Sequence, residues 1–260
     1  MSDSYNHVFK QSVNSFDSGL ISGGSSGGEG ALIGARGSIV GIGTDIGGSV
    51  RIPANLQGLY GLSPTTGRVT MDKSGRRSYI VPPVAGPLCH NLSTLETFME
   101  ALASSGKPWE YEAFAPPLPW RKELAAKPDR PLRIGYFFDD GLCRCQPPIE
   151  AAVKRAVNAM IAAGHDVFPW DSKAPETSHA EGNRLWLKGV LANGGKAYRA
   201  EAEKGGEPTI PGMLTGDLED ELDSDQGIEV GRALRKTSPE SSLTHCNSCT
   251  KKSAPTKRAT

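Results

Sequence analysis

Residues 23–34 read GGSSGGEGALIG, and residues 41–51 read GIGTDIGGSVR. Ser25 and Ser49 each follow a pair of glycines in these stretches. Glycine lets the backbone adopt positive φ and come close to a ligand, and successive N–H groups in such a turn can converge on an anion. A serine hydroxyl beside such donors is the arrangement that acyl transfer needs, because nucleophile and oxyanion hole then share one segment.

The composition of the chain excludes several function classes. The 260 residues carry 29 Lys and Arg against 29 Asp and Glu, which lacks the basic field typical of nucleic-acid binders. We therefore expect no nucleic-acid partner. No apolar run approaches the length of a membrane span, and no signal peptide is evident. Five cysteines in this pattern favour a reducing compartment, so we expect a cytoplasmic protein.

The rest of the chain predicts an α/β protein. Residues 91–105 show apolar residues at helical spacing, and Asn91 or Ser93 could cap the helix. Residues 132–138 (LRIGYFF) predict a buried strand, a helix follows from Pro147, and residues 165–170 start the next strand. A strand, a helix and a strand in this order predict a parallel pair. Residues 184–204 predict further helix, interrupted at 193–195.

Two other interpretations of the glycine-rich segment remain open at this point. The glycines at 41 and 43 match the start of a dinucleotide fingerprint, but Ile46 occupies the third glycine position. Residues 24–28 match GxSxG with Ser26 at the centre, which is typical of an α/β-hydrolase esterase. That nucleophile elbow needs a strong strand before it, whereas residues 17–22 contain only one short apolar pair.

Residues 23–68 strongly resemble the amidase signature family, in particular its acetamidase-like members. The resemblance runs through residues 23–34, 41–54 (GIGTDIGGSVRIPA) and 58–69 (GLYGLSPTTGRV), and continues more weakly through most of residues 5–200. It implies an amidase-signature fold, with a mixed β-sheet core flanked by helices. It also implies hydrolysis of the C–N bond of a carboxamide through an acyl-enzyme, with a small-molecule amide as substrate and no cofactor or metal.

The resemblance also assigns roles to individual residues. The family uses a Ser–Ser–Lys set, in which Ser49 matches the nucleophile and Ser25 the bridging serine that follows a cis peptide bond. The oxyanion hole of the family is matched by the backbone N–H groups of Ile46, Gly47, Gly48 and Ser49. Supporting positions are matched by Ser26, Thr44, Asp45 and Arg51. For Asp45 and Arg51 an equally good interpretation is that they only hold the loop.

Both ends of the chain depart from the family pattern. The lysine of the family's set lies well upstream of the bridging serine, whereas only Lys10 precedes Ser25 here, at a position that is not catalytic in the family. We therefore expect a partial amidase domain over residues 1–210, with its signature core at 23–68, and a disordered low-complexity tail over 211–260. The alternative function is a catalytically inactive amidase-like fragment.

The remaining features predict no further site. Cys143 and Cys145 form a CxC pair, and His245, Cys246 and Cys249 form an HCxxC cluster about a hundred residues later. CxC is a poor spacing for structural zinc, so no metal site is predicted. A homodimer is compatible with the sequence, although no feature of it supports one.

Overall fold

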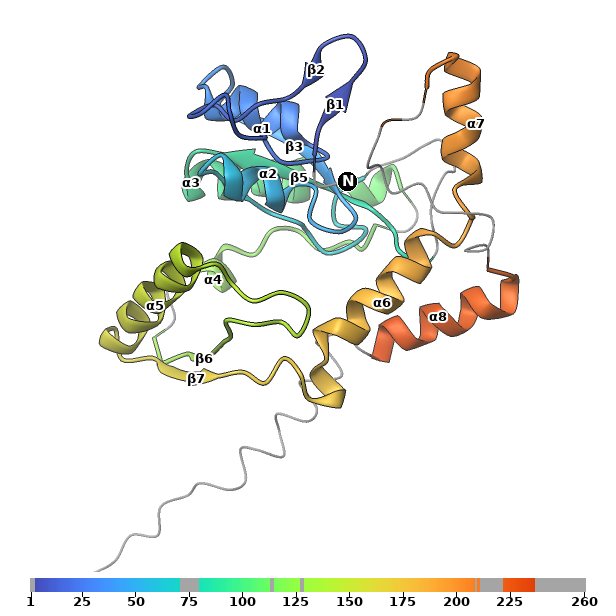
Figure 1. Ribbon diagram of the computed structural model, residues 1–260. Helices are drawn as coiled ribbons and strands as arrows, with labels where there is room; N and C mark the ends of the chain where they lie inside the picture. Colours follow the sequence, from blue (N-terminus) through green and yellow to red (C-terminus); the bar gives the residue numbers. More distant parts are fainter. Residues whose placement is uncertain are drawn as a thin grey trace, which may run out of the picture. The chain divides into compact units, whose positions relative to one another are not determined.

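The computed structural model describes residues 3–70, 80–112, 115–126, 129–208, 210 and 222–236 (Figure 1). The chain divides into two compact units. Unit 1 comprises residues 1–125 and 196–216, and unit 2 comprises residues 126–195 and 217–260. The α/β class expected from the sequence is confirmed, because both units combine helices with small sheets.

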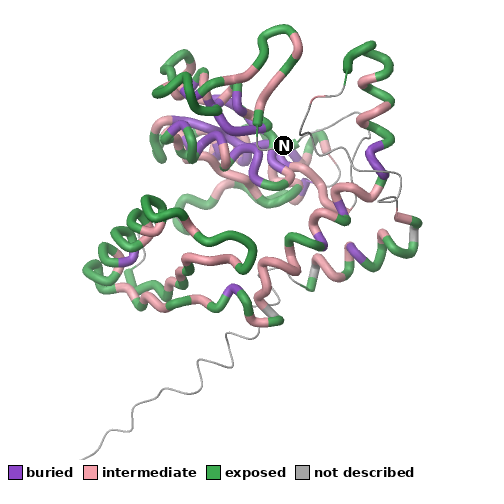
Figure 2. The backbone as a smooth tube through the Cα atoms, viewed as in Figure 1, coloured by how far each residue is buried: buried purple, intermediate pink, exposed green. Residues whose placement is uncertain are grey.

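A three-stranded antiparallel sheet forms the centre of unit 1, in the order β3 (Val40–Asp45), β5 (Val84–Cys89) and β4 (Tyr60–Gly61). All six residues of β5 are buried, as the purple tube in Figure 2 shows. Pro87 is tolerated in this central strand because its partner Ile42 turns its N–H away from β5, toward Glu29 Oε1 at 3.2 Å.

Helices cover this sheet and build two small apolar cores. One core combines α1 (Gly27–Gly34), α2 (Arg51–Leu56) and β5, and the other combines β5 with α3 (Leu92–Glu100). Their buried residues are Ile33, Val50, Ala54 and Leu88 in the first, and Cys89, Leu95 and Met99 in the second. The first core holds the two glycine-rich turns in place, because α1 begins just after Ser26 and α2 begins two residues after Ser49.

Smaller elements complete unit 1. The strands β1 (Tyr5–Asn6) and β2 (Lys10–Gln11) form a hairpin. The helix predicted over residues 91–105 is confirmed: Asn91 Oδ1 accepts the Thr94 N–H at 2.9 Å, and a π-helical turn, Ala101–Ser105, continues α3. The other elements are a 3-10 turn at Pro108–Glu110, α4 (Lys122–Ala125) and α7 (Lys196–Gly205).

Gln57 fastens the N-terminal segment to α2. Its side chain is fully buried, its Oε1 accepts from Ser15 Oγ at 2.7 Å and Ser15 N–H at 3.0 Å, and its Nε2 donates to Ser22 O at 3.4 Å. Asn14 adds a second link, because its Nδ2 donates to Leu56 O at 2.7 Å. These bonds fix the approach to the Ser25 turn.

We expect Gln57→Leu to destabilise unit 1 by about 2 kcal/mol, because it leaves the half-buried donors of Ser15 and the buried carbonyl of Ser22 without their partner. The free energy of unfolding from urea titration measures this loss. The control Gln146→Leu changes a glutamine that precedes α5 in unit 2 and has no side-chain cap bond. An equal loss in both variants would show that Gln57 has no special role.

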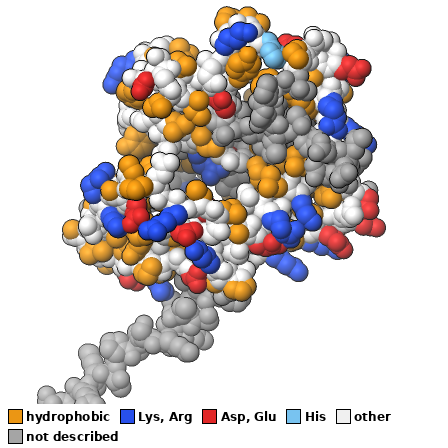
Figure 3. Space-filling view, in the orientation of Figure 1, with side chains coloured by type: hydrophobic (Ala, Val, Ile, Leu, Met, Phe, Trp, Pro, Cys, Tyr) orange, Lys and Arg blue, Asp and Glu red, His pale blue; other side chains and the backbone are white. Residues whose placement is uncertain are grey.

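Unit 2 contains the predicted strand, helix and strand, but the first strand is not buried as expected, because its residues alternate between exposed and half-buried. The strand β6 (Arg133–Tyr136) is parallel to β7 (Asp166–Pro169), and α5 (Pro147–Ala162) connects them. The surface around α5 carries ion pairs such as Lys154–Glu150 at 2.7 Å, and basic and acidic side chains lie intermixed there (Figure 3). A 3-10 turn at Pro175–Thr177 leads to α6 (His179–Val190), so the helix expected over 184–204 begins earlier and, after the break at 193–195, resumes as α7.

The described part of the segment expected to be a disordered low-complexity tail forms a regular element. A helix, α8 (Ser224–Lys236), packs against α6, and Val230 is buried there. Its apolar residues at helical spacing explain why it forms despite the polar composition. Residues 211–221 and 237–260 lie outside the described residues, as do His245, Cys246 and Cys249.

Candidate active site

The two glycine-rich turns meet at one place in unit 1. Ser49 is buried between the end of β3 and the start of α2, and Ser25 is exposed just before α1. The Ser26 N–H donates to the Ser49 carbonyl at 3.2 Å, which joins the turns directly. The Gly24–Ser25 peptide bond is cis. Serines that are 24 positions apart in the sequence therefore lie on adjoining segments.

Ser26 is a structural link between α1 and β3. Its Oγ accepts the Thr44 N–H at 3.1 Å and lies 3.3 Å from the Thr44 carbonyl, to which it donates. Gly43 allows this contact, because a Cβ there would lie 2.6 Å from Ser26 Oγ. No strand directly precedes Ser26. The strand that a nucleophile elbow requires directly before its turn and helix is therefore absent here, and the Ser26 hydroxyl instead binds the backbone of Thr44 in β3.

Asp45 organises the loop that carries Ser49. The residue is 3% exposed, and its Oδ1 accepts the Gly48 N–H at 2.7 Å while its Oδ2 accepts the Val50 N–H at 3.2 Å. Arg51 adds a two-point contact, Nε to Oδ2 and Nη2 to Oδ1, both at 3.0 Å. A bidentate pair of this kind fixes geometry as well as adding energy. Ser49 is thus held between three residues that share one carboxylate.

These contacts also keep Asp45 ionised. Burial alone would raise the pKa of its carboxyl group, but the hydrogen bonds from Arg51, Gly48 and Val50, together with the Arg51 charge, outweigh burial and lower it. The same pairing raises the pKa of Arg51. The loop is therefore held by a charged pair at neutral pH, in agreement with the interpretation in which Asp45 and Arg51 hold the loop.

The predicted oxyanion donors differ in their partners. The Gly48 N–H is engaged by Asp45, and Gly48 adopts φ of +122°, a conformation that favours glycine. Among the described residues, the N–H groups of Gly47 and Ser49 have no acceptor within hydrogen-bonding distance. The donors best placed for a ligand oxygen are thus those of Gly47 and Ser49, next to the Ser49 hydroxyl.

A profile of the family described as Amidase matches residues 1–236. The chain belongs to the amidase family. It is 37% identical over 195 residues to Amidase 1 of Gibberella moniliformis, which covers 73% of this chain and 36% of that relative. It is 36% identical over 219 residues to an acetamidase of Emericella nidulans, covering 81% of this chain and 39% of the relative.

Solved structures give the same assignment. A fatty acid amide hydrolase matches 95% of this amidase-family chain and 44% of its own length, with a TM-score of 0.83 and 30% identity. A bacterial aryl acylamidase of the amidase signature family matches 91% of the chain with a TM-score of 0.68 at 23% identity, which shows a shared fold. The chain spans roughly two fifths of the length of these curated relatives.

The structure does not join every residue of the expected catalytic set. Ser25 and Ser49 lie on adjoining turns, but no hydrogen bond links their hydroxyl groups among the described residues. Lys10, whose position is not catalytic in the family, lies exposed on β2 with φ of +66°. In the described part of the chain no helix is long and apolar enough to cross a bilayer, and no three His, Cys, Asp or Glu residues gather as a metal site.

Glu29 is a supporting residue that the sequence reasoning missed. Its Oε1 accepts the Ile42 N–H on the outer edge of β3, as Ser26 does for Thr44. Glu29 of α1 and Ser26, which directly precedes α1, thereby bind N–H groups that an edge strand leaves unpaired. The available signal was its position, because Glu29 is one of four charged residues in the otherwise uncharged segment 23–67.

Proposed function

We propose that this chain is the part of an amidase that carries the nucleophile and the oxyanion loop, and that its substrate is a linear carboxamide. Ser49 is the nucleophile, Ser25 is the bridging serine, and the oxyanion hole is formed by the N–H groups of Gly47 and Ser49, because the Gly48 N–H is engaged by Asp45. The observation that carries the proposal is the Ser26–Ser49 backbone bond, which holds the two serine turns together beside donors fixed by Asp45.

The reaction proceeds in two steps in this proposal. Ser49 Oγ attacks the amide carbonyl carbon while its proton passes to Ser25 Oγ, which gives its own proton to a lysine amine. The carbonyl oxygen becomes an oxyanion stabilised by the loop N–H groups. The C–N bond then breaks, the leaving nitrogen takes the proton, and ammonia or an amine departs. Water attacks the acyl-Ser49 ester and releases a carboxylate, which restores the hydroxyl.

The lysine of this set belongs, in the proposal, to a segment outside the 260 residues. Lys10 lies exposed on the β1–β2 hairpin, and neither Ser25 nor Ser49 receives a hydrogen bond from a lysine in the described part of the chain.

Relatives named acetamidase and fatty-acid amide hydrolase support an amide substrate. We place the protein in the cytoplasm, because Cys89, Cys143 and Cys145 are free thiols.

The second candidate function is an inactive amidase-like fragment, favoured by the same lack of a lysine contact among the described residues. Exogenous amine separates the two candidates. If only the base is lacking, methylamine restores ammonia release from acetamide, because a positioned general base contributes about 10²–10⁴-fold in rate and a freely diffusing one recovers part of it.

The rescue assay compares the chain with three variants at increasing methylamine concentration. We expect ammonia release to rise with methylamine in the native chain and in Ser38→Ala. The hydroxyl that this variant lacks donates only to the Val40 carbonyl in the native chain. We expect no rise in Ser25→Ala or Ser49→Ala. Native chain that releases no ammonia at any methylamine concentration, while melting cooperatively, would support the inactive fragment.

A further inference from the structure

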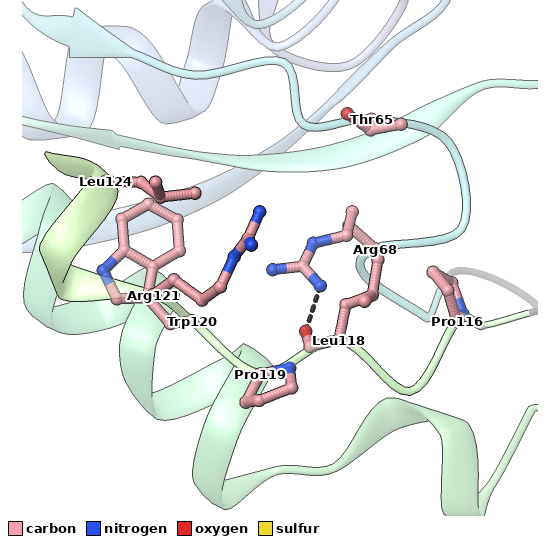
Figure 4. Close-up of a pocket in the computed structure, with 8 residues that line it drawn as sticks. All are labelled: Thr65, Arg68, Pro116, Leu118, Pro119, Trp120, Arg121 and Leu124. Atoms are coloured by element: carbon pink, nitrogen blue, oxygen red, sulfur yellow. Dashed lines mark hydrogen bonds between the residues drawn. The ribbon is translucent and has the colours of Figure 1, made fainter.

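A pocket of about 410 Å³ lies in unit 1 between the loop that follows β4 and the proline-rich segment that ends in α4 (Figure 4). None of its residues belongs to the serine turns. The residues that line it are Thr65, Arg68, Pro116, Leu118, Pro119, Trp120, Arg121 and Leu124. This volume lies in the range of small-molecule sites.

Two arginines line the pocket, and neither forms an ion pair with an acidic side chain among the described residues. The guanidinium groups of Arg68 and Arg121 both turn into it, as Figure 4 shows. Arg68 donates to the Leu118 carbonyl, which fixes its position, and Arg121 makes no hydrogen bond or ion pair in the described part of the chain. Two like charges that share a cavity repel each other, and an anion between them would replace this repulsion with attraction.

Most of the remaining wall is apolar, and within it Trp120 is anchored to the core. Trp120 packs against the core cluster of Cys89, Leu95 and Met99, and its backbone N–H donates to Ser104 Oγ at 3.0 Å. Leu124 lies next to the Trp120 ring in Figure 4. The pocket therefore combines positive charge with an adjoining apolar surface, which is the pattern of a site for an amphiphilic anion.

We propose that this pocket binds a carboxylate attached to an apolar chain. The planar donors of arginine match the two oxygens of a carboxylate, and such charge-assisted hydrogen bonds are the stronger ones in proteins. The apolar part of the ligand lies against Trp120 and Leu124. The site is separate in its residues from the serine turns, so it does not depend on the proposed hydrolysis.

Isothermal titration calorimetry of the full chain with octanoate tests this proposal. We expect one octanoate to bind per chain, and Arg121→Gln to weaken its Kd by about 10- to 100-fold, because one charge-assisted contact is lost. Arg121→Lys keeps the positive charge but not the planar guanidinium, so its Kd for octanoate should lie between that of the native chain and that of Arg121→Gln. The matched control is Arg155→Gln on α5, which lines no part of this pocket and should leave the Kd unchanged.

A series of ligands distinguishes specific recognition of a carboxylate with an apolar chain from nonspecific binding. 1-Octanol and inorganic phosphate should each bind at least tenfold more weakly than octanoate, because the first lacks the charge and the second lacks the apolar chain. The proposal is overturned if octanoate does not bind, if either comparison ligand binds as tightly, or if Arg155→Gln weakens binding as much as Arg121→Gln. Octanoate binding that survives Arg121→Gln unchanged would place it elsewhere, for example at the serine turns, and would also overturn it.

Discussion

Replacing Ser49 with alanine is expected to lower amide hydrolysis by at least about 10³-fold, because loss of a nucleophile removes the acyl-enzyme route altogether. Ser49 lies buried between Asp45 and Arg51, and alanine at this position removes one hydroxyl without changing the backbone contacts that hold the loop. Ammonia release from acetamide, measured in the presence of methylamine, reports the loss.

The control for Ser49→Ala is the same substitution at Ser38, another serine in the glycine-rich segment. Ser38 precedes β3, and its Oγ donates to Val40 O at 2.9 Å. Ser38→Ala should keep the native rate to within about twofold, and both variants should unfold within about 1 kcal/mol of the native chain. A Ser49→Ala protein that is folded and retains native turnover would show that another residue attacks the amide.

Replacing Asp45 with alanine is expected to reduce the free energy of unfolding of unit 1 by about 2–3 kcal/mol. The change leaves the N–H groups of Gly48 and Val50 without their acceptor and removes the partner of Arg51. The cost of breaking a buried ion pair is about 3–5 kcal/mol, and it is lower here because the Arg51 side chain is 57% exposed. Urea unfolding measures the loss, and hydrolysis should fall with it because the loop loses its fixed shape.

A double-mutant cycle separates the ion pair from the backbone contacts. Arg51→Ala alone should cost less than Asp45→Ala, since the two N–H bonds to the carboxylate remain. The double variant should cost less than the sum of the two single variants, because the removed groups interact. Purely additive losses would show that the two-point contact contributes nothing.

The pH dependence of the Asp45 effect has a definite sign. Its pKa is lowered in the folded chain, so its stabilising contribution is complete above the ordinary carboxyl pKa of about 4 and is lost as pH falls through the lower folded-state value. The stability difference between the native chain and Asp45→Asn should therefore shrink below about pH 4. A difference that grows with acidity would contradict the assigned pairing.

The glycine-rich turns illustrate how far the sequence alone predicts the site. Ser25 and Ser49 each follow a glycine pair, and glycine at such spacing is a local signal that needs no knowledge of distant contacts. The parallel pair β6–β7 was likewise predictable, because a strand, a helix and a strand in succession leave few topologies. Both predictions rest on short-range patterns.

Contacts between distant segments could not be predicted in the same way. Gln57 bonds to Ser15 and Ser22, and a lone buried glutamine carries no sequence signal of its partners. The occupation of the Gly48 N–H by Asp45 depends on loop geometry, and only the structure shows that this donor is already engaged. The helix α8 formed where low hydrophobicity predicted none, because it packs against α6 and buries Val230.

The most direct test of the account is the position of the acyl group on the chain. Incubation with the activated ester p-nitrophenyl butanoate should leave a butanoyl group, which tryptic digestion and mass spectrometry locate. Ser49 lies on the tryptic peptide of residues 37–51 and Ser25 and Ser26 lie on that of residues 11–36, so the two turns are distinguished by mass. The account predicts the adduct at Ser49 and none in Ser49→Ala. An adduct at Ser25 or Ser26 with Ser49 unmodified would contradict it.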